Sequence, residues 1–228
     1  MSANQQRILF TKPLSEHRKA LLEQMVEVTE VKALEPVLLP ISELPEPKEW
    51  IIVTSPNALE SIRILLEQGW GKNSKWATVG FRSQEKIAEF GITTTIKANH
   101  GKDLVSKLPE SGSAQYLCGK DRTPAVENYL SSNDWDFETI ETYWTQATHP
   151  HVNFNNFDAV CFFSPRNVTS VLRHNEWPTS GTDALAIGPT TAEALIKQGI
   201  TPLVVPETPD VLLLTQHYLE LKAHGSSK

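Results

Sequence analysis

The sequence lacks the marks of several large protein classes. It has two cysteines, Cys118 and Cys161, each within an apolar run typical of a buried strand, so we expect buried reduced thiols and no disulfide framework. It has no apolar stretch as long as a membrane span, and residues 1–7 are polar without an apolar signal segment. We therefore expect a cytoplasmic protein that does not bind to a membrane.

Positive charge is also scarce. The chain has 21 Lys and Arg residues against 27 Asp and Glu residues, a formal net charge of −6, and no basic run. A general nucleic-acid binder needs clustered Lys and Arg to neutralise phosphates, so we expect no nucleic-acid partner. The composition still permits a small anionic ligand that a few local groups hold.

Several motifs of known chemistry are missing. There is no G-x-G-x-x-G and no G-x-S-x-G, and Ala114 and Asp121 occupy two positions that a phosphate-binding G-x-x-x-x-G-K-[ST] would require. His149 and His151 lie in a proline-containing segment without Cys or carboxylate partners at useful spacing. We therefore expect no metal site.

The chain does contain an internal repeat. Hydrophobic residues make up 39% of its 228 residues, enough apolar material for two domains of about 110 residues each. Similar short patterns recur at an offset of 108 or 109 residues. The paired segments are 8–12 and 116–120, 53–56 and 162–165, Gly80 and Gly188, and 91–93 and 199–201. A duplicated α/β unit predicts two similar lobes with a cleft between them.

Short apolar runs alternate with amphipathic stretches of helical length. The predicted strands are 7–11, 28–34, 50–54, 75–79, 92–96, 115–118, 137–142, 158–163, 184–187 and 201–205. The predicted helices are 15–26, 57–68, 82–90, 101–108, 123–132, 166–174, 190–198 and 209–222. Strand followed by helix, repeated this often, predicts α/β lobes whose parallel sheets are covered by helices on both faces.

Two proline-containing segments interrupt this alternation at equivalent places in the two repeats. The first, 36–47, contains four prolines, and the second begins at Trp144 and contains Pro150 with several Asn residues. Proline at this density disfavours a helix or a central strand, so we expect inter-lobe linkers at 36–47 and 144–151. One lobe then runs from 48 to 143, and the other combines 1–35 with 152–228.

Polar residues gather where predicted strands end and helices begin, the edge at which open α/β sheets bind ligands. Helix capping alone explains each motif, and Thr190 with Glu193 fits a capping box. Several helix N-termini together would also favour a polycarboxylate or phosphorylated ligand, by about 0.3–1 kcal/mol each. The candidate substrate-binding residues at these junctions are Thr11, Lys12, Ser55, Lys120, Arg122, Ser164, Arg166, Gly188, Thr190 and Thr191.

The same junctions match a known family in order and spacing. The segments that match are 8–13, 54–58, 79–80, the Y-x-T at 143–145, 162–165, and 186–195 followed by 198–199. Together they resemble the motifs of uroporphyrinogen-III synthases over nearly the whole chain. The chain departs from the pattern at Lys12, where the family often has Arg, a planar two-pronged donor that Lys does not replace. It also has Arg82 and Ser83 at the positions that correspond to Thr190 and Thr191.

The resemblance implies a fold and a reaction. The fold is two doubly wound, flavodoxin-like parallel-sheet lobes joined by a two-stranded linker. The reaction, in haem and tetrapyrrole biosynthesis, closes the linear tetrapyrrole hydroxymethylbilane to uroporphyrinogen III with loss of water and inversion of ring D. It needs no metal or organic cofactor. The resemblance also suggests a monomer, with a transient handover of substrate from hydroxymethylbilane synthase.

The resemblance also assigns roles to two further residues. Tyr143 becomes the candidate catalytic residue, because its phenol could assist departure of the substrate hydroxyl, although an interdomain packing role explains it nearly as well. Ser83, opposite Thr191 in the repeat, joins the candidate substrate-binding residues.

Two other functions compete with the synthase. A two-lobed protein that binds a small polyanionic ligand without catalysis would share the same build, and so would an interaction or regulatory module that kept the fold and lost activity. The product isomer formed from hydroxymethylbilane separates them, since only a synthase gives isomer III.

Overall fold

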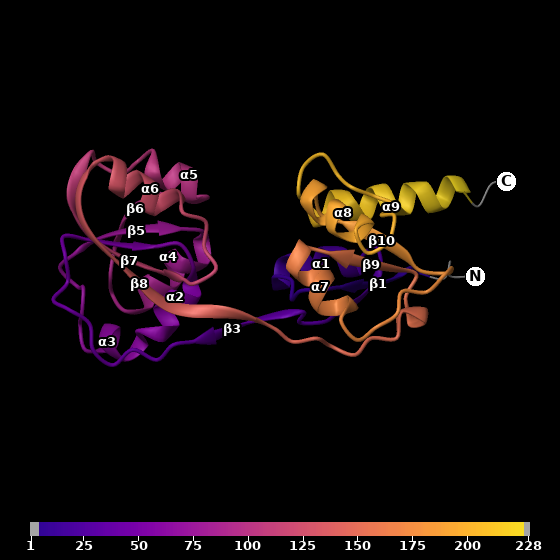
Figure 1. Cartoon of the computed structure of the whole chain (residues 1–228), viewed down its shortest axis with the longest axis horizontal. Helices are drawn as coiled ribbons and strands as arrows, with labels where there is room; N and C mark the ends of the chain where they lie inside the picture. Colours follow the sequence, from indigo (N-terminus) through magenta and orange to yellow (C-terminus); the bar gives the residue numbers. More distant parts are fainter. Residues whose placement is uncertain (1–4, 226–228) are drawn as a thin grey trace. The chain divides into compact units, whose positions relative to one another are not determined.

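The chain consists of two α/β units (Figure 1). The structure is a computed structural model that describes residues 5–225. Unit 1 contains the chain up to Glu35 and from Ala147 onward, and unit 2 is Pro36–Gln146. In both units parallel strands alternate with helices, which confirms the α/β class with parallel sheets.

Unit 1 contains a four-stranded parallel sheet in the order β10-β9-β1-β2. Its strands are β1 (Arg7–Phe10), β2 (Glu27–Glu30), β9 (Ala159–Phe162) and β10 (Asp183–Ala186). The predicted strand 201–205 is reduced to a single parallel bridge between Val204 and Leu185. Pro202 and Pro206 flank Val204, and neither has the N–H that a longer ladder needs.

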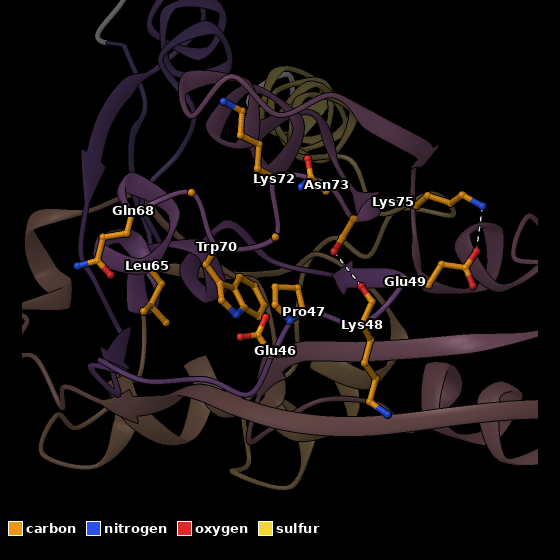
Figure 2. Close-up of a pocket in the computed structure, with 13 residues that line it drawn as sticks. Glu46, Pro47, Lys48, Glu49, Leu65, Gln68, Trp70, Lys72, Asn73 and Lys75 are labelled. Carbon is orange, nitrogen blue, oxygen red and sulfur yellow. Dashed lines mark hydrogen bonds and ion pairs between the residues drawn. The ribbon is translucent and has the colours of Figure 1, made fainter.

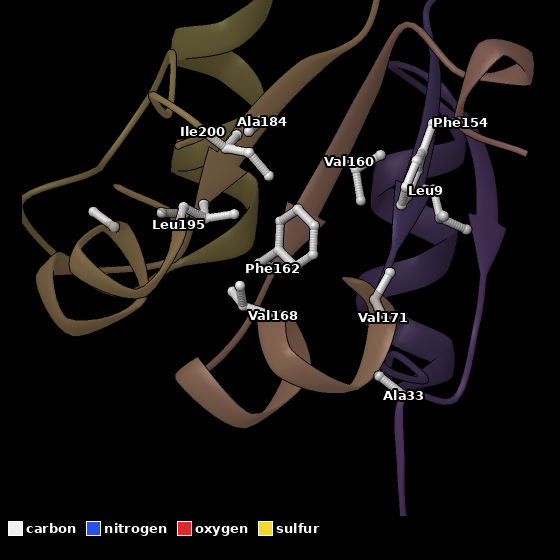
Figure 3. Close-up of a cluster of buried hydrophobic side chains, with 12 residues drawn as sticks. Leu9, Ala33, Phe154, Val160, Phe162, Val168, Val171, Ala184, Leu195 and Ile200 are labelled. Carbon is white, nitrogen blue, oxygen red and sulfur yellow. The ribbon is translucent and has the colours of Figure 1, made fainter. Parts of the chain in front are cut away.

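Helices cover both faces of this sheet. They are α1 (Glu16–Glu23), α7 (Pro165–Leu172), α8 (Pro189–Ile196) and α9 (Val211–Gly225), with a 3-10 turn η1 at Phe154–Asn156. On one face Phe162 lies in a buried cluster with Val168 of α7 and Leu195 of α8 (Figure 3). On the other face Phe10 belongs to a buried cluster with Tyr218 of α9. Each such side chain stabilises the fold by about 1.5–3 kcal/mol, so these two clusters hold the unit together.

Unit 2 contains a six-stranded sheet in the order β3-β8-β7-β4-β5-β6. Its strands are β3 (Leu34–Leu38), β4 (Trp50–Val53), β5 (Lys75–Val79), β6 (Thr94–Ala98), β7 (Ser111–Gly119) and β8 (Asp134–Ala147). The pairs β8–β7, β7–β4, β4–β5 and β5–β6 are parallel. All four residues of β4 are buried, because this strand is central and covered on both faces.

The helices of unit 2 are short. They are α2 (Pro56–Ser61), α3 (Arg63–Glu67), α4 (Phe81–Glu89), α5 (Gly101–Val105) and α6 (Ala125–Ser132). On one face Trp76 and Leu117 pack in a cluster with Ile87 of α4. On the other face Tyr116 packs in a cluster with Leu130 of α6. Neighbouring positions along β7 therefore face opposite layers, as the alternation of a strand requires.

The structure differs from the sequence expectation in three further segments. The predicted helix 57–68 is interrupted at Ile62, next to Ser61, whose hydroxyl donates to the carbonyl of Asn57 one turn back, a bond that bends helices. Pro36 lies within β3, because an edge strand tolerates a residue without an N–H. Residues 144–147, expected in a linker, continue strand β8.

In each unit a buried serine hydroxyl is bonded to a backbone carbonyl beside the boundary between the units. In unit 1 the Ser170 hydroxyl donates to the Ala33 carbonyl at 2.6 Å, and the Thr148 N–H donates to the same carbonyl at 3.1 Å. In unit 2 the Ser61 hydroxyl donates to the Thr142 carbonyl, which also accepts the Leu39 N–H at 2.9 Å. These bonds fix the chain where it leaves and re-enters each unit.

Candidate functional site

The carboxyl ends of the strands of unit 2 surround a cavity of about 340 Å³. The connections β4 to β5 to β6 run along the sheet in one direction and β7 to β8 in the other, so the strand order reverses between β4 and β7. Ligands of open α/β sheets bind outside the carboxyl ends of strands at such a point. The walls include Thr54, Tyr116, Tyr143, Arg122 and His100, contributed by the ends of β4, β7 and β8 and by the starts of α5 and α6. The cavity is the candidate functional site.

Tyr143 of β8 reaches this cavity over a glycine. A Cβ built on Gly119, its partner in β7, would lie 2.6 Å from Cζ of Tyr143 and 2.8 Å from its hydroxyl oxygen. The ring therefore lies directly against the backbone of Gly119, and any larger residue there would displace it. The Tyr143 hydroxyl makes no hydrogen bond within residues 5–225, so it is available to a ligand.

Arg122 lies on the cavity wall in a cluster with two carboxylates. Its Nε donates to Glu127 Oε1 at 2.6 Å, and its Nη1 donates to Glu141 Oε1 at 2.9 Å. Nη1 also donates to the carbonyl of Gly119 at 3.2 Å. Burial lowers the pKa of the Arg122 guanidinium, but the hydrogen bonds with Glu141 and Glu127 outweigh this and leave the pKa above its usual range. Arg122 is thus a permanent cation whose charge is already compensated.

The phenol of Tyr116 and the thiol of Cys118 stay protonated at neutral pH. Tyr116 is 2% exposed, and its hydroxyl lies 3.2 Å from that of Thr54. Burial raises the pKa of Tyr116 to about 12 and that of Cys118 to about 12.

Cys161 in unit 1 is fully buried, and burial raises its pKa as well. Both cysteines are free and buried, which confirms the expectation of reduced core thiols and leaves neither as a nucleophile.

In unit 1 a serine and a glycine begin helices at the carboxyl ends of β9 and β10. Ser164 caps α7, with its hydroxyl accepting the N–H of Asn167 at 3.2 Å. Gly188 caps α8 through its carbonyl, which accepts the N–H groups of Thr191 and Ala192. The predicted capping box of Thr190 with Glu193 is wrong, since the N-cap is Gly188, which has no side chain, and Thr190 lies two positions further into the helix.

Two candidate substrate-binding residues are buried in the protein interior. The Thr11 hydroxyl, 0% exposed, donates to the carbonyl of Cys161 at 2.9 Å. Ser83, also 0% exposed, has a hydroxyl without a hydrogen-bond partner among the described residues. Neither hydroxyl is exposed in this arrangement, and a substrate-binding role for these two residues stays a prediction. Thr11 joins β1 to β9.

The other candidates lie at the expected strand ends. Lys12, Lys120, Arg166 and Thr190 are exposed, and Thr191 is buried at the start of α8. The ammonium of Lys12 lies 4.5 Å from the centre of the Phe163 ring, a cation–π contact. Ser55 caps α2, accepting the N–H of Asn57 at 3.3 Å. Of all the candidates, Arg122 and Tyr143 line the cavity of unit 2.

A larger cavity, of about 650 Å³, lies at the opposite edge of the unit 2 sheet (Figure 2). It is lined by the segments before β4 and β5. In Figure 2 the ammonium groups of Lys48, Lys72 and Lys75 point in different directions. Two of them are bound in ion pairs, Lys75 with Glu49 and Lys48 with Asp136. Because its charged groups do not converge, we assign the functional site to the smaller cavity.

Sequence reasoning missed Tyr116, Glu127 and Glu141. Tyr116 stands within the apolar run of β7 and was assigned only to a strand. The repeat predicted from the sequence offers a signal, since it pairs Tyr116 with Ile8, and a tyrosine in place of isoleucine adds a hydroxyl at the end of a buried ring. The sequence spacing of Glu127 and Glu141 does not predict that both contact Arg122, because the fold brings the three residues together.

Within residues 5–225, no three His, Cys, Asp or Glu side chains are grouped as metal ligands would be. No helix in that range has the length and apolar character needed to cross a lipid bilayer.

Comparison with known proteins gives one family. The family model for uroporphyrinogen-III synthase HemD matches residues 16–216. The crystal structure of uroporphyrinogen-III synthetase from Helicobacter pylori 26695 superposes with a TM-score of 0.69 at 18% identity, covering 95% of this chain and 99% of that one. A mutant uroporphyrinogen III synthase from the extremely thermophilic bacterium Thermus thermophilus superposes with a TM-score of 0.56 at 18% identity, covering 97% and 99%. At this identity the structures support the fold. No curated protein matches the chain.

Proposed function

The chain belongs to the uroporphyrinogen-III synthase family, lyases that close a linear tetrapyrrole in haem biosynthesis, and we propose that it does so with polar groups at the carboxyl ends of its parallel strands. The family match over residues 16–216 supports the reaction. The cavity that contains Tyr143 and Arg122 at the end of the unit 2 sheet supports the location.

The substrate carries eight carboxylates on a flexible chain, so binding has to select one curled shape. Helix N-termini offer unpaired N–H groups and a favourable dipole to such carboxylates. We propose that the starts of α7 and α8 and the cations near the strand ends serve this purpose. The proposed substrate-binding residues are Lys12, Ser55, Lys120, Arg122, Ser164, Arg166, Gly188, Thr190 and Thr191.

The chemistry then needs little beyond orientation. A pyrrole nitrogen of the bilane expels the hydroxyl, which leaves as water after taking up a proton, and an azafulvene results. Ring D attacks this centre from its already substituted carbon and gives a spiro intermediate. The intermediate opens and recloses with ring D inverted, and loss of a proton restores the aromatic pyrrole. Because closure in free solution gives the uninverted isomer, catalysis consists mainly of holding the reacting carbons in place.

Tyr143 is proposed to donate the proton that the departing hydroxyl takes up. Replacing it with Phe is expected to lower kcat roughly tenfold, since a phenol is a weak acid and the pyrrole nitrogen supplies most of the driving force. KM and the unfolding temperature should change little, because the ring keeps its contact with Gly119. Steady-state kinetics and thermal unfolding check this, and an unchanged kcat would leave Tyr143 a packing residue.

The reaction itself is tested with freshly prepared hydroxymethylbilane. The protein is expected to convert it to uroporphyrinogen III, distinguished by chromatography of the oxidised porphyrins. A protein that only binds polyanions, or a regulatory module without activity, would leave uroporphyrinogen I formed at the spontaneous rate. That outcome would refute the synthase assignment for this chain.

We further propose that both units are flavodoxin-like and descend from one duplicated segment. Unit 1 has the order β2-β1-β9-β10 followed by the bridge at Val204, and unit 2 has the order β8-β7-β4-β5-β6. These orders agree if β1 and β2 correspond to β7 and β8, and β4 and β5 to β9 and β10. The hydrogen bonds that the buried serines Ser61 and Ser170 make to backbone carbonyls support the same correspondence. The three pairs 61 and 170, 33 and 142, and 39 and 148 are each separated by 109 positions. Strands β3 and β8, neighbours in one sheet, would form the two-stranded linker.

We propose finally that the protein acts as a monomer and receives its substrate by transient handover from hydroxymethylbilane synthase. The spontaneous closure of the free bilane to the wrong isomer supports the handover, because a short time in solution limits that loss.

A further inference from the structure

We propose that the hydroxyls of Tyr116 and Thr54 form a binding subsite for one carboxylate of the linear tetrapyrrole. This inference rests on the proposed function, and it adds two binding residues that determine how the substrate is placed on unit 2. Both residues line the cavity, and they come from the two adjacent strands between which the strand order reverses.

The first observation is the hydrogen-bonding capacity of the pair. The two hydroxyl oxygens lie 3.2 Å apart, so one hydroxyl donates to the other. The accepting hydroxyl keeps its own proton, and no other hydrogen bond of either hydroxyl is recorded within residues 5–225. One O–H donor therefore remains for a ligand. Because burial raises the pKa of Tyr116 to about 12, its hydroxyl stays protonated throughout the neutral pH range.

The second observation is that the sheet of unit 1 carries apolar residues at the positions equivalent to this pair. Tyr116 is 2% exposed and packs in the apolar cluster with Leu130 and Val126. In the repeat, the positions that correspond to Tyr116 and Thr54 are Ile8 and Phe163, both apolar. The sheet of unit 1 is thus built without hydroxyls at the equivalent point. An apolar pair therefore suffices to build a sheet at this point, so the two hydroxyls of unit 2, which bond to each other and line the cavity, point to a ligand-binding role.

The third observation is that the rest of the cavity is rich in donors. The eight-residue helix α6 begins at its wall, no side chain caps that helix, and its first residues, Ala125 and Val126, line the cavity. His100 accepts the N–H of Asp103 at its Nδ1, which leaves Nε2–H as a donor when the ring is neutral. Arg122 lines the cavity, whereas its carboxylate partners do not. The cavity wall therefore offers hydrogen-bond donors and contains no carboxylate side chain from residues 5–225, which favours a carboxylate as the ligand.

The test compares two tyrosine-to-phenylalanine variants in the same unit. Tyr116→Phe keeps the buried ring and removes the hydroxyl, and it is expected to raise KM for hydroxymethylbilane about tenfold, the loss of one hydrogen bond to a charged group, with kcat within about twofold. Tyr129→Phe is the control, because its hydroxyl donates to the carbonyls of Leu108 and Pro109 at 3.1 and 3.2 Å, before the first residue of β7. Its KM should equal that of the unmodified protein.

A second arm separates binding from a structural effect. Bilanes in which one carboxylate side chain is replaced by an alkyl group are compared in turn. The unmodified protein should bind the analogue that lacks the cognate carboxylate about tenfold more weakly, and Tyr116→Phe should no longer distinguish that analogue from the parent bilane. If Tyr116→Phe does not fold, Thr54→Val, at the partly buried partner, undergoes the same comparison.

Two outcomes would overturn the inference while leaving the proposed function intact. One is a KM for Tyr116→Phe equal to that of Tyr129→Phe with isomer III still formed. The other is a variant that discriminates among the analogues as the unmodified protein does. Formation of isomer I alone by the unmodified protein would instead refute the proposed function.

Discussion

Gly119→Ala is expected to lower kcat about 100-fold, because the new methyl group would occupy the place of the Tyr143 ring. The Cβ would lie 2.6 Å from Cζ, 2.7 Å from Cε2 and 2.8 Å from the hydroxyl oxygen, where ordinary contacts are 3.4–4 Å. Gly119 does not have a positive φ, so alanine fits its backbone and the effect acts through the ring. Displacement by about 1 Å misplaces both the proton donor and the substrate lying against it. Steady-state formation of uroporphyrinogen III measures the loss.

A double-mutant cycle shows whether this loss acts through Tyr143. In a Tyr143→Ala background the ring is absent, so adding Gly119→Ala should change kcat by no more than about twofold. Thermal unfolding of all four proteins controls for a general loss of structure. A further tenfold loss in the background without the ring would show that Gly119 acts on another group, and the placement of Tyr143 in the site would be wrong.

The local sequence pattern predicted most of the strands and helices of the fold. Buried strands such as β4 and β9 are continuous apolar runs, and Ser55 and Ser164 with a following proline start helices as expected. The misassigned segments depend on long-range contacts. Pro36 is accepted in β3 because that strand lies at the edge of the sheet. Residues 144–147 extend β8 because β-strand pairing continues beyond the predicted lobe.

The candidate site was only partly predictable, for a related reason. Strand ends and helix caps are local features, so the positions of Lys120, Arg122 and Tyr143 follow from sequence. Whether an individual hydroxyl is buried does not follow from the sequence. Thr11 follows β1 and Ser83 lies in the first turn of α4, where ligand donors are plausible, yet the packing of neighbouring strands and helices encloses both. Tyr116 was missed for the opposite reason, since it lies in the core as its apolar run predicts and also lines the cavity.

Arg122→Met is expected to lower the free energy of unfolding by about 2–3 kcal/mol, because two carboxylates lose the cation they share. The Arg122 and Glu127 side chains are only 22% and 19% exposed, and Glu127 Oε2 is already buried without a partner within residues 5–225. Arg63→Met is the matched control, since the pair of Arg63 with Glu67 has the same kind of contact at 57% and 50% exposure. For Arg63→Met the free energy of unfolding should fall by less than about 0.5 kcal/mol. Urea denaturation of both variants measures the difference, and equal losses would contradict the role assigned to the Arg122 cluster.

The structural role of Arg122 can be separated from its proposed role in binding by a second substitution. Arg122→Met combined with Glu127→Leu removes both ends of the less exposed pair, so most of the lost stability should return, while Glu141 at 43% exposure remains solvated. No hydrogen bond of the Arg122 Nη2 group is recorded within residues 5–225, so that group is free to contact a substrate carboxylate. The stable double variant is therefore expected to keep a KM about tenfold above that of the unmodified protein. A KM that recovers together with stability would show that Arg122 serves only to hold the strand ends of unit 2 in place.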